Sequence, residues 1–174
     1  FNLQSSELPE APPAHWLGRS IDQASFPEQS FDADDDSLAY LIDYRGYYAP
    51  RTLYQLLDAG VRVQAANESF QLSGQESAVP LGSLLVHVGS QPEKRKAVQR
   101  IREAASRRDG VKITPTRTGL TPDGADLGSS SLKQLKLPKV LLAIGVGVTT
   151  SEAGEIWHLL DHRFGIPVSL VDSD

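Results

Sequence analysis

Residues 138–172 constrain the fold of this chain more than any other stretch. A short apolar run opens the stretch, with the length of a buried strand and too few residues for a helix. Gly145 and Gly147 follow, and apolar residues then recur at spacings of three and four as far as Gly165, as on one face of a helix. A second apolar run covers residues 166–171. This order predicts two parallel strands joined by a helix through a right-handed crossover, with helices covering the sheet.

The turn between the first of these strands and the helix is a candidate binding site. Backbone amides of a glycine turn at a helix N-terminus can hold an anion, aided by the helix dipole. Thr149 and Glu152 have the spacing of a capping box, but the dinucleotide fingerprint requires a third glycine where Thr150 stands. The sequence therefore predicts a tight structural turn, with a weak anion- or small-ligand-binding site as the alternative. The residues of that weak site are Gly145, Gly147, Thr149 and Ser151.

The preceding residues predict more strands and helices in alternation. The segment 38–65 has the form of a second β-α-β unit. With the last unit this gives about six strands and three helices, an order that favours an α/β fold with a mostly parallel sheet and helices on both faces. The further strands are expected at residues 38–43, 61–65, 83–88 and 111–114, and the further helices from Pro50 to Gly60 and from Glu93 to Asp109.

Two segments lack a helical or strand period and divide the chain. Residues 1–36 contain several prolines and an acidic run, which predict an extended arm or linker. Residues 115–137 predict a connecting loop with a short helical turn near Leu132. The loop joins a first α/β half, residues 37–114, to the last unit, residues 138–174. We expect the two halves to form one compact domain, cut from a longer protein.

Composition excludes several classes of function. The chain has no cysteine, which excludes disulfides, thiolate metal sites and a cysteine nucleophile. Its net charge of −5 makes nucleic acid a poor partner, and no apolar run approaches the length that crosses a membrane. Basic side chains gather on the expected helix at 93–109, where a solvated face is commoner than a phosphate or acidic-partner site. These residues are Lys94, Arg95, Lys96, Arg100, Arg102, Arg107 and Arg108.

Three polar side chains share one flank of the last predicted helix, namely Glu155, His158 and His162. Groups of this kind can share a metal ion. Asp161 stands beside them, so ion pairs within one turn of the helix explain the pattern more simply. We therefore expect surface ion pairs on this flank, and no metal site.

Two aspartates mark the ends of predicted strands. Asp43 and Asp172 each follow an apolar run. Open α/β sheets bind their ligands beyond the carboxyl ends of the strands. Both aspartates are therefore added to the weak candidate ligand site. His87 lies inside an apolar run, and we expect it to be a hydrogen-bonded core residue.

Several short pieces of the last segment form a recognisable set, namely Pro138-Lys139-Val140, residues 151–155 (SEAGE), Trp157, Asp161 and residues 166–168. On these pieces the segment resembles the start of the class I glutamine-amidotransferase-like domain that follows the catalytic domain in large bacterial zinc carboxypeptidase proteins. Residues 39–43 with the leucine helix after them, and residues 78–83, resemble the region between the peptidase and amidotransferase-like parts of those proteins. The resemblance spans roughly residues 37–172, with its specific motif in the last segment.

The resemblance implies a flavodoxin-like sheet but no catalysis by this chain. An amidotransferase of this class needs a nucleophilic cysteine on a strand-to-helix elbow, and the chain has none. Zinc carboxypeptidases hold their metal through a His-x-x-Glu pair and a distant histidine. Each histidine of this chain lacks a glutamate three residues later; the four are His15, His87, His158 and His162.

The resemblance therefore implies a non-catalytic accessory domain of a zinc-carboxypeptidase-like metallopeptidase. Such a domain supports the peptidase domain or substrate binding, with the peptidase domain as its partner and with zinc in the peptidase rather than any cofactor here. The family suggests a periplasmic or secreted protein, with neither nucleic acid nor membrane as a partner. An unfinished sheet would leave a strand edge open, so the isolated chain is also expected to be prone to dimerisation. The alternative is the small-ligand or anion-binding module at the 145–151 turn.

Overall fold

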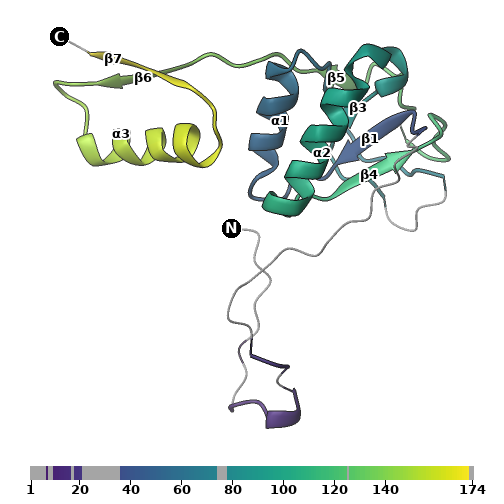
Figure 1. The fold of residues 1–174 in the computed structure, drawn as a ribbon, viewed down its shortest axis with the longest axis horizontal. Coiled ribbons are helices and arrows are strands. Elements are labelled where there is room, and N and C mark those ends of the chain that lie inside the picture. The colour runs from purple at the N-terminus through teal and green to yellow at the C-terminus, as the bar shows by residue number, and fades with distance from the viewer. Residues whose placement is uncertain are drawn as a thin grey trace.

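The computed structural model describes residues 7, 10–16, 18–20, 36–73, 78–124 and 126–172, so most of the arm predicted over residues 1–36 lies outside the described part. Figure 1 shows two units side by side, and α1 of the first unit faces the second. The first unit holds β1 (Ala39–Ile42), α1 (Ala49–Asp58), β2 (Gln64–Ala66), β3 (Leu84–Val86), α2 (Arg95–Asp109), β4 (Ile113–Thr116) and β5 (Leu132–Gln134). The second holds β6 (Val140–Ile144), α3 (Thr150–Trp157), a π-helical turn (His158–Arg163) and β7 (Val168–Asp172). Short 3₁₀ turns cover Ala14–Trp16, Val88–Ser90 and Pro92–Lys94.

The first unit is built on a five-stranded sheet in the order β4-β1-β3-β2-β5, with every neighbouring pair antiparallel. Both β1 and β2 run antiparallel to β3 between them, so β1 and β2 are parallel to each other. By the same argument β3 and β4 are parallel, with β1 between them. Each helix thus joins two parallel strands that a third strand separates. This split β-α-β order is that of ferredoxin-like folds, with β5 added beside β2.

The predicted mostly parallel, flavodoxin-like sheet of about six strands with helices on both faces was wrong. Most of the expected strands exist, but β3 inserts between β1 and β2. Hydrophobic period identifies a strand and says nothing about which strand lies beside it. The helical turn expected near Leu132 is instead β5, which pairs with β2 and covers an edge that would otherwise be open.

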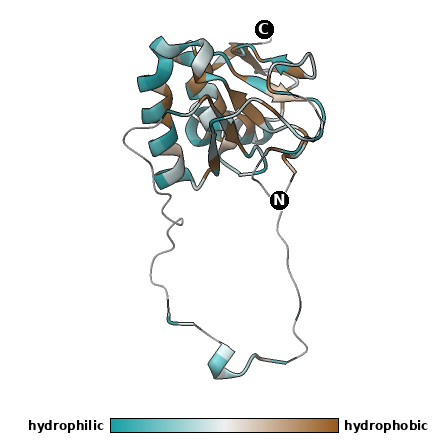
Figure 2. Ribbon diagram, turned by 90° about the vertical axis from the view of Figure 1, so that its right-hand side faces the viewer, coloured by the Kyte–Doolittle hydropathy of each residue, from teal (hydrophilic) through white to brown (hydrophobic). Residues whose placement is uncertain are grey.

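Both faces of this sheet are covered, because successive side chains along the strands point alternately into two separate hydrophobic cores. Tyr40 and Ile42 of β1 belong to a core beneath α1 and α2, together with Leu56 and Val98 of those helices. Leu41 belongs to a second core on the opposite face, where loop residues such as Phe70, Leu72, Val79 and Leu127 cover the strands. Figure 2 shows the apolar colour gathered in the strands and the polar colour on the outer sides of the helices. The helices therefore cover one face, and loops cover the other.

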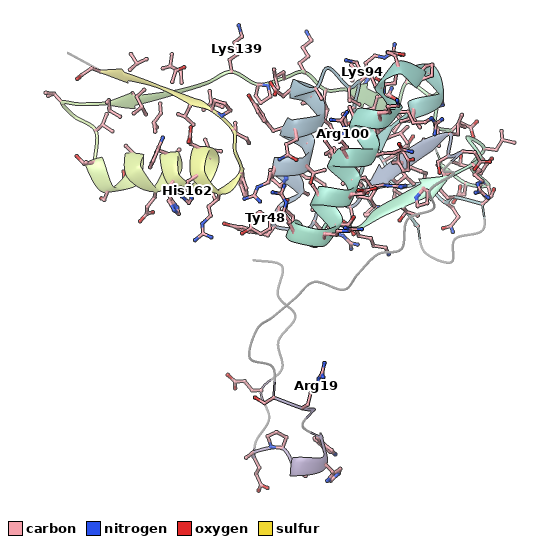
Figure 3. The ribbon with its side chains drawn as sticks, viewed as in Figure 1. Arg19, Tyr48, Lys94, Arg100, Lys139 and His162 are labelled. Atoms are coloured by element: carbon pink, nitrogen blue, oxygen red, sulfur yellow. The ribbon has the colours of Figure 1, made fainter. Side chains whose placement is uncertain are left out.

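Some basic side chains in and just before α2 are exposed to solvent, and the others contact the protein. Lys96, Arg100, Arg107 and Arg108 are exposed, as expected for a solvated face. Arg102 is 4% exposed, and its guanidinium lies 4.7 Å from the ring centroid of Tyr40. At the start of the helix, Lys94 donates to the carbonyl oxygen of Ala59 over 2.9 Å, and Arg95 donates to that of Ser37 over 3.2 Å. Figure 3 shows Lys94 and Arg100 at different places along this segment.

The second unit confirms the β-α-β prediction for residues 138–172. Here β6 and β7 are parallel neighbours, with Val140 opposite Val168 and Ile144 opposite Asp172. Gly165 has a φ of 64° and ends the helical segment, as predicted. The pair forms a sheet of its own and does not extend the sheet of the first unit.

Candidate functional site

The glycine turn and one of the two predicted aspartates lie at the carboxyl ends of β6 and β7. Ile144 lies opposite Asp172, so both parallel strands end at the same level, and the glycine turn follows Ile144 there. Gly145 and Gly147 have φ of 95° and 84°, in the left-handed region that glycine enters without strain. The amide of Val148 donates to the carbonyl oxygen of Gly145 over 3.2 Å. The prediction of a tight glycine turn is confirmed.

The helix after this turn begins without the predicted capping box. Thr149 is the N-cap residue, with φ and ψ of −68° and 112°, but its side chain makes no capping hydrogen bond. Ser151 and Glu152 are exposed in the first turn of α3. The capping-box prediction was wrong because the start of this helix lies in solvent, where water can satisfy the amides that a capping box would hold.

An apolar cavity of about 350 Å³ opens between α3 and the sheet beside the turn. Gly154 faces the cavity, and a Cβ there would meet no atom within 4 Å, so the helix leaves space at this point. The volume lies in the range of sites for small molecules. Its apolar side chains are Leu142, Ile144, Val148, Ala153, Trp157 and Leu170.

The chemistry of this edge favours an apolar group over an anion. Among the described residues that line the cavity, none is a lysine, arginine or histidine. Asp172 places a negative charge at the same edge of the sheet, and like charges repel. An anion would therefore be held by backbone amides and the dipole of a short helix alone.

Asp43 directly follows β1 of the other sheet, where the neighbouring Arg45 pairs with it. Its Oδ1 accepts from the backbone amide and the Nε of Arg45 over 3.0 and 2.9 Å, and its Oδ2 pairs with the Arg45 guanidinium over 2.6 Å. The side-chain hydrogen bond from Arg45 lowers the pKa of Asp43, against the raising effect of partial burial. A polar hollow of about 70 Å³ adjoins Asp43, with Ser83 and Lys112 in its wall. The structure therefore brings Gly145, Gly147, Thr149, Ser151 and Asp172 together in one unit and leaves Asp43 in the other.

The two histidines at the end of α3 stack on each other. The ring centroids of His158 and His162 lie 4.9 Å apart, with the rings tilted by only 13°. Ring stacking, rather than the predicted ion pairs, is thus the contact seen on this flank. In the part of the chain that the structure describes, no three histidine, aspartate or glutamate side chains gather as metal ligands would.

His87 is hydrogen-bonded, as predicted, but it is half-buried just after β3 rather than a core residue within the strand. Its Nδ1 accepts from the backbone amide of Ser90 over 3.2 Å, and the hydroxyl of Ser90 donates to the carbonyl oxygen of His87 over 3.0 Å. These bonds form the short turn after β3. They give His87 a structural role at the end of that strand.

Arg51 of α1 joins the two units, a contact that the sequence did not indicate. Its Nη1 donates to Oδ1 of Asp109 over 2.7 Å, and its Nε donates to the carbonyl oxygen of Arg163 over 2.9 Å. The Asp109 side chain is 3% exposed, and the guanidinium also lies 4.5 Å from the ring centroid of Tyr48. The partners are 58 and 112 residues from Arg51 in the sequence, so no local pattern could reveal them. We call this contact the Arg51 junction; Tyr48 lies at the end of α1 nearest the second unit (Figure 3).

Apolar groups pack beside the Arg51 junction. The rings of Tyr47 and Phe164 lie 5.5 Å apart. A separate cleft of about 170 Å³ between the units has Tyr44, Leu53 and Ile166 in its wall. Burial at this cleft raises the pKa of the Tyr44 hydroxyl. The second unit therefore rests on α1 through both polar and apolar contacts.

The side of the β6–β7 sheet turned away from α3 is mostly apolar, with one serine among its residues, and lies in solvent. Alternate β6 residues line the cavity under α3, which places Leu141 and Ala143 on the opposite side. The strand register sets Ser169 beside Leu141 and Val171 beside Ala143. Leu141 is 67% exposed and Val171 is 42% exposed. We call these four residues the outer face.

Known proteins offer no relative for comparison, since no family model, curated protein or solved structure matches this chain. Within the described ranges, no helix has the length and apolar character to span a membrane.

Proposed function

We propose that this chain is a non-catalytic accessory α/β module of a zinc-carboxypeptidase-like metallopeptidase, which supports or orients the peptidase domain. The observation that carries the proposal is the outer face, an apolar sheet surface that the described residues leave in solvent. Contiguous apolar surface on a folded protein marks contact with another protein. The resemblance of residues 138–172 supplies the class of that partner.

The second unit has the composition of a sheet that is covered on both sides. Parallel strands are apolar on both faces because they are normally buried on both, and β6 follows this rule with five apolar residues in sequence. The helix α3 covers one side only. The helical segment itself exposes Ile156, Trp157 and Leu159. A partner that covers the outer face would give this sheet the surroundings that its sequence requires.

The arrangement of the candidate catalytic and metal-binding side chains supports a positioning role for this chain rather than a catalytic one. Hydrolysis by a zinc peptidase requires a metal with an open coordination position and a nearby general base. Asp43 is paired with Arg45, and His158 is stacked on His162. These groups lie in different units and do not converge on one point. The proposal accordingly assigns the chemistry to the peptidase domain.

A small-ligand module is the second candidate, and the cavity under α3 is the observation that favours it. Its lining suits a small apolar ligand better than the anion that the 145–151 turn suggests. A ligand specific to the folded state raises the melting temperature. A thermal-shift screen with phosphate, nucleotides, amino acids and short-chain fatty acids tests this candidate. Stabilisation by the fatty acids alone would support the cavity, and stabilisation by phosphate would support the turn.

Purification of the native protein tests the accessory role. An antibody against residues 151–164 isolates the particle that contains this chain, and its mass, zinc content and carboxypeptidase activity are measured. We expect a mass several times 18.9 kDa, with about one zinc per particle in a catalytic site. A particle near 18.9 kDa without zinc would overturn the proposal. Stoichiometric zinc bound by residues 1–174 alone would overturn it as well.

A matched pair of variants tests the outer face in the same particle. Val171→Lys places a charge in the outer face, whereas Leu120→Lys places the same charge on a loop of the first unit where the leucine is 72% exposed. We expect Val171→Lys to lower the temperature at which the peptidase activity is lost, because it weakens the contact with the peptidase domain. Leu120→Lys should leave that temperature unchanged. Equal effects of the two variants would show that the outer face does not support the peptidase.

A further inference from the structure

The two sheets of the described residues have four strand edges, which differ in how they are protected against pairing. The edges of the five-stranded sheet are β4 and β5, which carry Pro115 and Lys133 within the strand. Proline and lysine are the residues by which native sheets prevent an edge from pairing with another chain. In the second sheet, β7 ends at Asp172 and contains Ser169. The fourth edge belongs to β6, whose five residues carry no proline, lysine or other polar side chain.

Among the edges of the described sheets, β6 alone carries neither proline nor a polar side chain, and an unprotected apolar edge is suited to pairing. We propose that β6 pairs with β6 of a second copy of this chain, antiparallel and about a two-fold axis, to form the four-stranded sheet β7-β6-β6-β7. The pairing is isologous, so each copy presents the same surface to the other. It lies at the strand edge, beside the surface of the proposed accessory role, and leaves Val171 of both copies free.

The residues of β6 are complementary to themselves in this arrangement. Full overlap of the strand sets Leu142 opposite Leu142 of the second copy, and Val140 opposite Ile144. Leu141 then faces the small side chain of Ala143, so a large residue meets a small one twice across the axis. Cross-strand apolar pairs stabilise antiparallel sheets, and like charges placed opposite each other destabilise them. No charged residue of β6 lies in this seam.

The cavity under α3 also favours pairing at β6 over pairing at β7. Leu142 and Ile144 of β6 line the cavity, whereas β7 contributes only Leu170 among the described residues. The two-fold axis stands perpendicular to the sheet, so both copies of α3 lie on the same side of the four strands and both cavities lie along the seam. Two strands alone give a sheet of marginal stability, and four strands with helices on one face exceed the usual minimum.

Charge reversal across the seam tests the pairing and its register. A lysine variant carries Leu141→Lys and Ala143→Lys, and a glutamate variant carries Leu141→Glu and Ala143→Glu; all four substitutions fall at exposed positions. Sedimentation equilibrium should show that the native protein is a dimer and that each variant alone is a monomer, because like charges then face each other. A mixture of the two variants should restore the dimer. The control Ser169→Lys with Val171→Lys puts the same charges on the same side of the sheet one strand away, and it should remain dimeric.

A cysteine scan keeps the test decisive if the charged variants fold poorly. The protein has no native cysteine, so Leu142→Cys and Leu170→Cys each introduce a single thiol. Oxidised glutathione should link two copies of the Leu142→Cys variant, because that position faces itself across the axis, and should not link copies of the Leu170→Cys variant. A native protein that is monomeric at every concentration would overturn the proposal, as would a dimer that survives in the lysine or glutamate variant alone or that cross-links at position 170. Peptidase activity is not measured in either experiment, so a failure here is distinct from a failure of the accessory role.

Discussion

The two units of this protein bury the faces of their sheets to different extents. In the first unit, Leu85 points away from the helices and is 1% exposed, because loop residues cover that face of the sheet. In the second unit, Leu141 also points away from the helix and is 67% exposed. Both positions are leucines on the helix-free side of a strand. The difference shows that loops of the first unit cover the helix-free face of its sheet. The corresponding face of the second unit is left uncovered and is able to contact another surface.

The edge strands of the two sheets differ in the same way. Antiparallel β4 and β5 end the first sheet with Pro115 and Lys133, whereas β6 ends the second with apolar residues alone. Strand composition and side-chain burial therefore both indicate that the first unit covers its own sheet. Both also indicate that the second unit carries the surfaces for the contacts that the proposed function requires.

The largest expected effect compares the two leucines directly. Leu85→Ala removes side-chain volume from a closed core and should destabilise the fold by about 2–5 kcal/mol. Leu141→Ala removes an exposed side chain and should change stability by less than about 0.5 kcal/mol. Urea unfolding midpoints of the two variants measure the difference. Equal losses would mean that Leu141 is already covered in solution, either by the second copy across the β6 seam or by a docked partner.

The Arg51 junction gives the next largest effect, because it connects the two units. Arg51→Ala leaves the buried Asp109 carboxylate without its cationic partner, which should cost about 1–3 kcal/mol of the free energy of unfolding. It also removes the bonds to the carbonyl oxygen of Arg163. Amide hydrogen exchange should therefore quicken in the π-helical turn as well as in α1.

The matched control is Arg45→Ala, since Arg45 belongs to an exposed ion pair within the first unit. Exposed pairs contribute little to stability, so its unfolding midpoint should shift much less than that of Arg51→Ala, and the exchange rates of the second unit should stay unchanged. Unchanged exchange in the π-helical turn of Arg51→Ala would contradict a junction between the units.

Two glycines of the second unit should respond in opposite directions. A Cβ at Gly147 or at Gly154 would meet no atom within 4 Å, so neither substitution creates a clash. Gly147 has a φ of 84°, and Gly147→Ala should therefore destabilise the unit by about 1 kcal/mol through backbone strain. Gly154 lies within α3, where alanine should stabilise the helix by about 0.5–1 kcal/mol. Thermal unfolding followed by circular dichroism compares the two, and a loss of stability in Gly154→Ala would show that the cavity cannot accept even a methyl group.

Local pattern predicted the elements of this fold better than their arrangement. The β-α-β unit at 138–172 was correct because its strands are neighbours and the helix that joins them lies between them in sequence. The same reasoning failed for residues 38–65, where β3 separates β1 from β2. A crossover helix fixes that two strands are parallel, but the sequence of the crossover does not say whether a third strand lies between them. The parallel relation of β1 and β2 was thus predictable, and the antiparallel sheet was not.

The candidate site followed the same rule. Gly145, Gly147, Thr149 and Ser151 are close in sequence, and the parallel register brings Asp172 to the same edge. Asp43 was added by analogy with the ends of parallel strands, and the antiparallel sheet placed it in the other unit. The Arg51 junction depends on residues from three distant segments, so only the folded chain reveals it.

The smallest expected effect is on the pKa of Asp43. This pKa shows whether Asp43 is held in an ion pair or is available to bind a ligand. Hydrogen bonding from Arg45 depresses the pKa of Asp43 below the ordinary value of an aspartate in the folded chain. A depressed pKa of this kind contributes stability above the pKa of the unfolded chain, and the contribution is lost as the pH falls through the lower, folded value. Carboxyl carbon chemical shifts measured against pH should give a midpoint for Asp43 below that of an unpaired aspartate. Arg45→Ala should raise that midpoint, whereas Arg62→Ala, whose guanidinium bonds to Ser90 instead, should leave it in place. If Arg45→Ala left the midpoint unchanged, Asp43 would be available to bind a ligand in the polar hollow, and the first unit would carry a site as well as the second.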